Sequence, residues 1–273
     1  MKTIIAAISG GVDSVTMLDI LETSHSNVIV AHFNHGIRSD SDEDEQLVGE
    51  LAAQYGFKYE RKKEDLGADA SETYARERRY KFLNEVATKY NGTIYTAHHA
   101  DDVVETIALN LIRGTGWRGL TPLDNPDIIR PLIGWWKSDI RDYVEKNQLR
   151  WREDSTNLHG EHLRNRVRKA LRSLDLQEKK KLLELYQQQK TLKRQIDTLV
   201  SGLTTTNRQF FREADDAVAL EVLRAICTKQ NITPLRKNLK LALDAIRTFK
   251  NGKKFELNKY VTIKMNRDDF ELI

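Results

Sequence analysis

The chain has 273 residues, which suits one large domain and one small domain with enough length for a hydrophobic core. Apolar residues make up 40% of it, which favours a folded globular protein and excludes a chain that is disordered throughout. Lys and Arg total 44 against 40 Asp and Glu, a net charge of +4, so a nucleic-acid site would require clustered cations.

The cysteine content and the apolar run near the N-terminus indicate the cellular compartment of the protein. Cys227 is the only cysteine in the sequence, which excludes an internal disulfide and a cysteine-based metal site and fits a reducing cytosol. The apolar run at residues 3–8 stops at a Gly-Gly pair and is too short for a signal peptide. No other window approaches the length of a membrane span, so we expect a cytoplasmic protein without membrane segments.

Strand and helix patterns alternate in the first part of the chain. Short apolar runs predict buried strands at residues 3–8, 28–33 and 93–97. Helical spacing, acidic first turns and glycine stops predict helices at residues 15–21, 41–55, 71–90 and 101–113. This alternation predicts an α/β domain with a mainly parallel sheet.

The second part of the chain is predicted to be mostly helical. Residues 135–148 and 161–174 have helical patterns without a preceding strand, and residues 176–200 predict a long amphipathic helix. After a break near residues 201–207 come two helices and three short strands, at residues 214–229, 235–249, 253–257, 260–265 and 270–273. We therefore predict a first domain at 1–175, a connecting helix at 176–203 and a small α+β domain at 204–273.

The strongest chemical signal is the sequence Ser-Gly-Gly-Val-Asp-Ser at residues 9–14, between a strand and a helix. Two glycines let the backbone turn sharply and approach a ligand, and the following helix start attracts phosphate. Asp13 suits such a place only if Mg²⁺ or a donor network separates it from the phosphate. The alternative is an ordinary capped turn, and the Walker pattern is excluded because no Gly-Lys-Ser/Thr follows.

Histidines and carboxylates gather at residues 98–105. Asp102 and Glu105 are three residues apart at a helix start, so they share a face where two carboxylates hold a cation, either Mg²⁺ or an ammonium group. Asp101 is a candidate helix cap, and the alternative is that all three acids only favour the helix start. No partner spacing supports His98 or His99 as a metal ligand.

Two segments carry clustered cations. The glycine-rich residues 113–119 either clamp an anion or nucleotide or merely turn the chain. Residues 150–172 hold three acids and seven bases, namely Arg150, Arg152, Arg164, Arg166, Arg168, Lys169 and Arg172. With Trp151, this pattern suits phosphate contact and base stacking on RNA, although a charge run is more often a solvated face. The acidic residues 40–45 are expected to form a solvated helix start.

Together these motifs resemble the tRNA(Ile) lysidine synthetases, a branch of the ATP pyrophosphatases, or PP-loop proteins. The matching segments follow the order of that family, at residues 9–14, 31–38, 75–80, 96–106, 113–120, 154–157 and 164–168. The resemblance covers about residues 1–175, and the later region resembles more weakly the small second domain of the shorter members. A short form without the third domain of longer members is therefore implied.

The resemblance implies a doubly wound sheet with ATP at the carboxyl ends of its strands. It also implies the reaction: the O2 of a cytosine attacks the α-phosphate of ATP, pyrophosphate leaves, and the amine of free L-lysine then displaces AMP. The product is lysidine at the wobble position of an isoleucine tRNA. The implied partners are ATP, Mg²⁺, tRNA and L-lysine, and a monomer and a homodimer both remain open.

The same resemblance, with the spacing arguments above, assigns the candidate residues. The catalytic candidates are Asp13, Asp102 and Glu105, with Mg²⁺ on Asp13 and Asp102. The expected ATP contacts are Ser9, Gly10, Gly11, Val12, Asp13, Ser14, Ala31, Phe33, Arg113 and Gly114. The expected contacts to the other substrates are Asp102, Glu105, Arg76, Arg79, Arg164, Arg166 and Arg168.

Two other functions stay open at this point. Related enzymes that place sulfur on cytidine in tRNA generally use paired cysteines, and the single Cys227 argues against that chemistry. A non-enzymatic RNA-binding protein with an inactive nucleotide fold is disfavoured by the intact glycine loop and the acidic helix start.

Overall fold

The computed structural model describes residues 2–24, 27–37, 40–67, 70–153 and 163–273. Within them the chain forms two compact units, the first made of Met1–Leu109 with Pro122–Glu184 and the second of Asn110–Thr121 with Leu185–Ile273. This division places residues 110–121 with the second unit. The predicted domain limits at residues 175 and 203 stay predictions.

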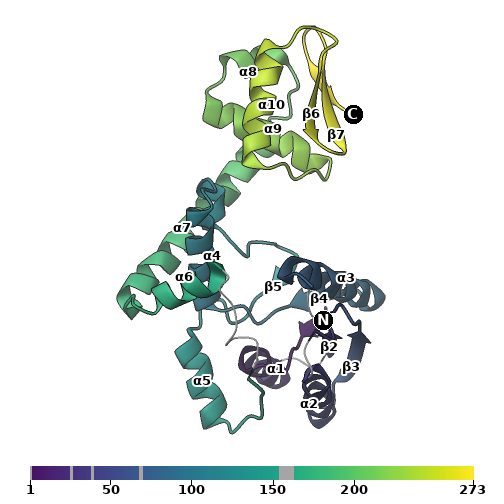
Figure 1. Cartoon of the computed structure of the whole chain (residues 1–273), viewed down its shortest axis with the longest axis vertical. Coiled ribbons are helices and arrows are strands. Elements are labelled where there is room, and N and C mark those ends of the chain that lie inside the picture. Colours follow the sequence, from purple (N-terminus) through teal and green to yellow (C-terminus); the bar gives the residue numbers. More distant parts are fainter. Residues whose placement is uncertain (1, 25–26, 38–39, 68–69, 154–162) are drawn as a thin grey trace. The chain divides into compact units, whose positions relative to one another are not determined.

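A parallel sheet forms the centre of the first unit (Figure 1). Its strands lie in the order β3-β2-β1-β4-β5, with bounds β1 Thr3–Ala7, β2 Val28–Asn34, β3 Lys58–Lys63, β4 Gly92–Tyr95 and β5 Ile128–Ile129. All four strand pairs are parallel, and β1 pairs with β2 on one side and β4 on the other. The strand order reverses between β1 and β4, which confirms the predicted doubly wound fold.

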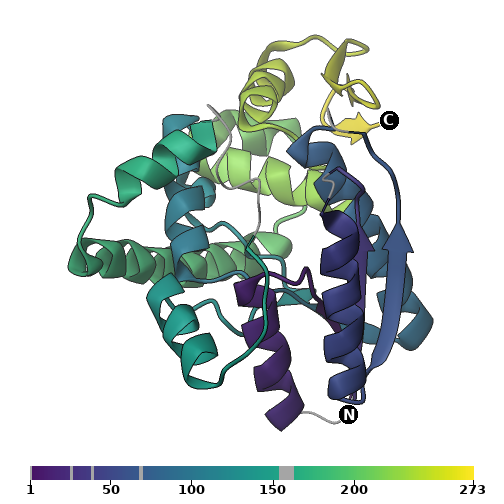
Figure 2. The ribbon, with the colours of Figure 1, turned by 60° about the horizontal axis from the view of Figure 1, so that its bottom comes forward.

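Helices cover both faces of this sheet because β1 and β2 are apolar on both sides. Ile4 and Ala6 face a core shared with α1 (Val12–Ser24), α2 (Ser41–Gln54) and α5 (Lys137–Lys146), and Figure 2 shows α1 and α2 side by side. Ile5 faces a second core with α3 (Glu72–Tyr90). Alternate residues of a strand point to opposite faces, so the continuous apolar run predicts this two-sided burial.

Three further helices of the chain pack beside this sheet or extend from it. A small core joins α4 (Ala100–Ile112), α6 (Leu163–Leu171) and α7 (Leu176–Ser201). The 26-residue α7 is amphipathic, as predicted. Over the stretches that the structure describes, no helix combines the length and apolar character needed to cross a membrane.

Strand β3 was not predicted, because its sequence Lys-Tyr-Glu-Arg-Lys-Lys is almost entirely charged. It pairs with β2 over six residues and forms one edge of the sheet. Lysines on an edge strand discourage pairing with the strands of other chains. The charged sequence of β3 is therefore typical of an edge strand, although it resembles that of a loop.

The second unit packs helices against a small antiparallel sheet. Its elements are η1 (Trp117–Leu120), α8 (Arg208–Glu213), α9 (Asp216–Lys229), α10 (Arg236–Thr248), β6 (Lys254–Asn258), β7 (Val261–Met265) and β8 (Phe270–Leu272). Helices α8, α9 and α10 and the three strands enclose one apolar core, which includes Cys227 and Phe211. The predicted α+β character of this region is confirmed, whereas the short helix α8 was not predicted.

Arg208 is the one charged residue among the buried polar side chains of the second unit within the described residues. Its guanidinium donates hydrogen bonds to three backbone carbonyls, those of Ile246 at 2.8 Å, Asn266 at 2.9 Å and Phe249. These carbonyls end α10 or lie in turns, so they lack partners in regular secondary structure. Arg208 therefore satisfies backbone groups that would otherwise be buried without hydrogen bonds.

Replacing Arg208 by Met should destabilise the second unit by about 2–4 kcal/mol, because three buried carbonyls would lose their donors. Denaturant unfolding followed by circular dichroism measures this change. The exposed Arg267→Met is the matched control and should change stability by less than about 0.5 kcal/mol. Equal effects of the two substitutions would contradict the role assigned to Arg208.

Candidate active site

The loop at residues 9–14 turns sharply from β1 into α1. Gly10 has a φ of +89°, in the left-handed region that favours glycine. The hydroxyl of Ser14 accepts a hydrogen bond from the Ser9 N–H at 3.2 Å and donates to the Gly11 carbonyl at 2.8 Å. The first turn of an α-helix leaves N–H groups without intrahelical partners, so this braced turn suits an anionic ligand.

Asp13, in the first turn of α1, contacts residues from two other elements. The Nζ atom of Lys137, the first residue of α5, is 2.5 Å from Oδ1 of Asp13. Nε2 of His99 is 3.8 Å from the same oxygen and 3.7 Å from Oδ2 of Asp102. The structure therefore brings Asp13 and Asp102 together beyond β1 and β4, where a doubly wound sheet binds ligands.

Asp101 and Asp102 use their side chains differently. Oδ2 of Asp102 accepts a hydrogen bond from the backbone N–H of His99 at 3.0 Å, so this carboxylate also caps its own helix. Asp101 instead accepts the backbone N–H of Lys137 at 2.8 Å and lies 3.6 Å from Nζ of Lys179. Asp101 thus joins the start of α4 to the start of α5 and fixes the backbone that carries Lys137.

The charges around Asp102 oppose its ionisation. Burial raises the pKa of Asp102, and the nearby carboxylates of Asp13 and Glu105 add to this rise, while His99 counteracts it. Burial and three nearby arginines lower the pKa of His98 to about 3, so this side chain is neutral near pH 7. His98 is therefore unsuited to donate a proton as an imidazolium.

Two carboxylates of the site have the composition of a magnesium site. Although the described residues contain no group of three metal-binding side chains, Mg²⁺ is commonly held by one or two carboxylates with phosphate oxygens and water. Asp13 and Asp102 approach the same histidine nitrogen, and the charge of Asp13 contributes to the raised pKa of Asp102. A cation between these two carboxylates would relieve that repulsion, so they fit Mg²⁺ bound with ATP.

Glu105 lies one turn further along α4 and is paired with arginines. Its side chain is 7% exposed, and its two oxygens lie 2.5 Å from Nε of Arg164 and 3.0 Å from Nε of Arg168. Arg164 also pairs with Glu72 at the start of α3. The paired arginines come from α6, so this helix is positioned by the acidic face of α4, whereas Arg166 between them is exposed.

Four other candidate residues lie on β2 and α3. Ala31 and Phe33 are buried, and the ring of Phe33 packs 6.0 Å from that of Phe82. The guanidinium groups of Arg76 and Arg79 lie over the ring of Tyr80, at 4.9 and 5.7 Å from its centroid. Core packing thus accounts for Phe33. The charges of Arg76 and Arg79 help to lower the pKa of His98, so both arginines lie close to this histidine.

Arg113 and Gly114 belong to the second unit. Both are exposed at the end of α4, and Gly114 has a φ of +66°. Their neighbour Arg118 pairs with Asp197 at 2.6 Å and with Glu221 at 2.7 Å. One of the two cations of the predicted anion clamp is therefore neutralised by acids of its own unit.

The expectation of a solvated acidic segment at residues 40–45 is wrong for Asp44. Asp44 is buried, at 7% exposure, and its carboxylate pairs with Arg152 at 2.9 Å. Trp151, expected to stack on RNA bases, packs partly buried against the core of the first unit. The motif at residues 154–157 lies outside the described residues.

Sequence patterns did not single out Lys137 or Lys179. Each is an ordinary lysine in a charged helix, and only folding places Lys137 beside Asp13 and Lys179 near Asp101. The one available signal was the position of Lys137 at the start of a helix that follows an apolar run, a place where cations are disfavoured without an acidic partner.

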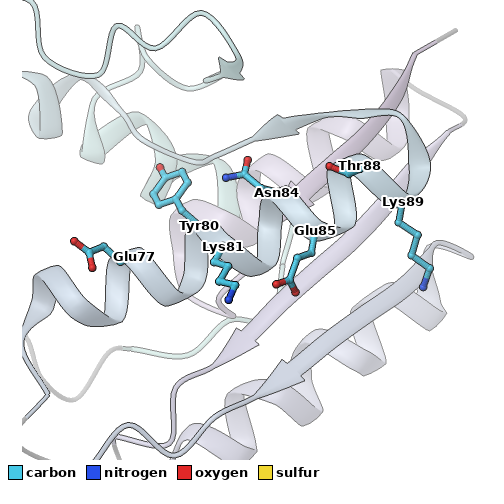
Figure 3. A pocket seen from close by; sticks show the side chains of 7 residues that line it. All are labelled: Glu77, Tyr80, Lys81, Asn84, Glu85, Thr88 and Lys89. Carbon is cyan, nitrogen blue, oxygen red and sulfur yellow. The ribbon is translucent and has the colours of Figure 1, made fainter. Parts of the chain in front are cut away.

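A shallow hollow lies away from these residues, along α3 (Figure 3). It has a volume of about 930 Å³ and is lined by Glu77, Tyr80, Lys81, Asn84, Glu85, Thr88 and Lys89. All seven side chains come from one helix, and none belongs to the loop at residues 9–14 or the carboxylate cluster. The candidate site is therefore identified by its loop and its carboxylates and not by a hollow in the surface, since a phosphate-binding loop acts through backbone N–H groups.

Curated proteins of known name match part of this chain. The tRNA(Ile)-lysidine synthase of Geobacter sulfurreducens is 35% identical over 183 residues, and that of Clostridium tetani is 38% identical over 184 residues. Each match covers 62% of this chain and 39% of the relative, so the chain spans about two fifths of these relatives' length.

A solved structure supports the fold. The U34-tRNA thiolase NcsA from Methanococcus maripaludis superposes with a TM-score of 0.60 at 19% identity, covering 70% of this chain and 72% of that one. A family model described as the PP-loop domain matches residues 1–174, which confirms the resemblance indicated by the loop at residues 9–14. The chain therefore belongs to the PP-loop domain family.

Proposed function

We propose that the protein ligates L-lysine to C2 of the wobble cytidine of an isoleucine tRNA, using ATP and releasing pyrophosphate and AMP. The proposal rests on the PP-loop match and on the relatives named tRNA(Ile)-lysidine synthase. In this proposal the protein acts in the cytoplasm, and residues 204–273 help to recognise the tRNA.

The observation that carries the proposal is the meeting of Asp13, Asp102 and Lys137 beside the loop at residues 9–14. Bound Mg²⁺ would offset phosphate charge during adenylation. The loop and the start of α1 hold the pyrophosphate portion of ATP, and Lys137 provides a cation next to the same phosphates. These groups stabilise the charge that moves onto pyrophosphate when the cytosine O2 attacks the α-phosphate.

The second step needs an acceptor for the ammonium group of lysine. In the proposal Asp102 and Glu105, one turn apart on α4, provide the carboxylate that holds this ammonium group and takes its proton. Glu105 binds the same substrate while Arg164 and Arg168 limit its negative charge. Carboxylates at this end of α4 favour a nucleophile that arrives as an ammonium group over a neutral one such as water.

A sulfur-transfer reaction has no support from the cysteine of this chain. Cys227 is fully buried in the core of the second unit, and burial raises the pKa of its thiol to about 11. A protonated, inaccessible thiol is a poor nucleophile.

Nucleoside mass spectrometry of tRNA incubated with the protein, ATP, Mg²⁺ and L-lysine tests the reaction. We expect the mass of lysidine in place of one cytidine, together with AMP and pyrophosphate. Omission of lysine should abolish the new nucleoside while leaving some pyrophosphate release from adenylation. A modified nucleoside that forms equally well without lysine would refute the proposal.

Substituting Lys137 by Ala should slow pyrophosphate release by about 100-fold, because the transition state loses a cation beside the phosphates. A pyrophosphate-release assay at saturating tRNA measures the effect. Lys146→Ala, at the exposed far end of the same helix, is the control and should retain full activity. Normal turnover by the Lys137 variant would remove this residue from the site.

The arginines of α6 should separate into two functional classes. Arg166→Ala should weaken tRNA binding and flatten its salt slope by about one unit, because one phosphate contact is lost. The double substitution of Arg164 and Arg168 by Ala should instead lower the melting temperature, because the Glu105 carboxylate is left buried without cations. Salt-dependent binding and thermal unfolding, measured on both variants, decide whether this division holds; a reversed pattern would contradict it.

A further inference from the structure

The backbone carbonyl oxygens of Gly10 and Gly11 both accept hydrogen bonds from other groups of the protein. The N–H of Arg152 donates to the Gly10 carbonyl at 3.0 Å, and Arg152 and Gly11 pair as an isolated parallel bridge. The Gly11 carbonyl accepts from the Ser14 hydroxyl at 2.8 Å and from the Val15 N–H at 3.0 Å. Because carbonyl oxygens repel phosphate, an anion-binding loop requires its carbonyls to be engaged elsewhere.

The side chain of Arg152 binds the start of α2. Its Nε atom lies 2.9 Å from Oδ1 of Asp44, and its NH1 atom lies 2.6 Å from Oε2 of Glu43. Its NH2 atom is 3.9 Å from Oδ2 of Asp40. Asp44 is buried, and it surrounds the guanidinium of Arg152 together with two other acids of the same segment. These contacts fix both the position and the orientation of the Arg152 side chain.

The start of α2 also touches the loop itself. A Cβ atom on Gly10 would lie 3.6 Å from the carbonyl oxygen of Asp44 and 3.7 Å from its Cα. Gly10 thus rests against Asp44, while Arg152 holds Gly10 through its backbone and Asp44 through its side chain. Three segments distant in sequence form one closed set of contacts around the loop.

We propose that Arg152 is a positioning residue of the phosphate loop: it sets the orientation of the Gly10 peptide that ATP binding requires. The proposal rests on the proposed use of ATP at residues 9–14. Arg152 acts through the loop and does not itself touch ATP. The charged pattern of residues 150–172 instead suggested contact with RNA phosphates, but three acids already surround this guanidinium.

Arg152→Gln tests this role through the binding of ATP with Mg²⁺, measured by isothermal titration calorimetry on the full chain. We expect about tenfold weaker ATP binding and a similar rise in the KM for ATP, because a small displacement of a binding group is costly. The KM for lysine, the affinity for tRNA and its salt slope should stay unchanged. Asp44→Asn should reproduce part of the defect, and the double variant should be no worse than Arg152→Gln alone, since the loss of Arg152 already removes its contact with Asp44.

Arg150→Gln is the matched control, because Arg150 is 63% exposed and pairs at 3.2 Å with Glu50. It should bind ATP like the wild type. Wild-type ATP affinity in a folded Arg152→Gln protein, or weaker tRNA binding with unchanged ATP binding, would overturn the proposal. If that variant does not fold, Arg152→Lys and Asp44→Asn are judged by the same criterion. Wild-type protein that binds ATP but forms no lysidine would refute the proposed reaction and leave the role of Arg152 intact.

Discussion

At the carboxyl ends of β1 and β4, the carboxylates of Asp13 and Asp102 approach Nε2 of His99, and that of Asp101 approaches Nδ1 of the same ring. Like charges this close repel one another, so the surrounding elements have to supply cations and N–H groups. α5 supplies Lys137 and a backbone N–H, and α7 adds a lysine near Asp101. The helices beside this end of the sheet thus place cations and N–H groups around one concentration of negative charge.

Such an arrangement prepares the site for a ligand that brings its own charge. ATP adds negative charge and Mg²⁺ adds positive charge, and the two arrive together in the proposed reaction. In the proposed reaction Lys137, which lies 2.5 Å from Asp13, would face phosphate if Mg²⁺ were bound at Asp13. The pair thus holds the loop in an organised state before the substrate binds, which reduces the cost of ordering it later.

Basic residues that suggest an RNA surface in the sequence are largely used inside the fold. Arg152 neutralises the start of α2, Arg164 and Arg168 neutralise Glu105, and Arg150 pairs with Glu50. A paired arginine contributes little long-range attraction to RNA, because its field is cancelled nearby. In the proposed function, contact between this segment and RNA would therefore rely on exposed cations such as Arg166 rather than on the local charge total.

Arginine has a comparable structural use in the second unit. Arg208 donates to three backbone carbonyls, and Arg247 donates to the carbonyls of Phe211 and Ala214 while pairing with Asp216. Carbonyl groups in the turns between its helices and strands have no partner in regular secondary structure, so they need side-chain donors. Guanidinium groups meet that need because each carries five N–H donors in a fixed plane.

The sequence by itself determined three of the five strands, the parallel character of the sheet and the sharp glycine turn at residues 9–14, because apolar period, glycine placement and helix starts are local properties. It also predicted that Asp102 and Glu105 share a helix face. It missed β3, whose charged residues make sense only at a sheet edge. Only the tertiary structure decided the partners of each charge: Asp13 with Lys137, Glu105 with two arginines of α6, and Asp44 with Arg152. Those pairings join residues far apart in the chain, and electrostatic energy depends on distance in space, which no local pattern contains.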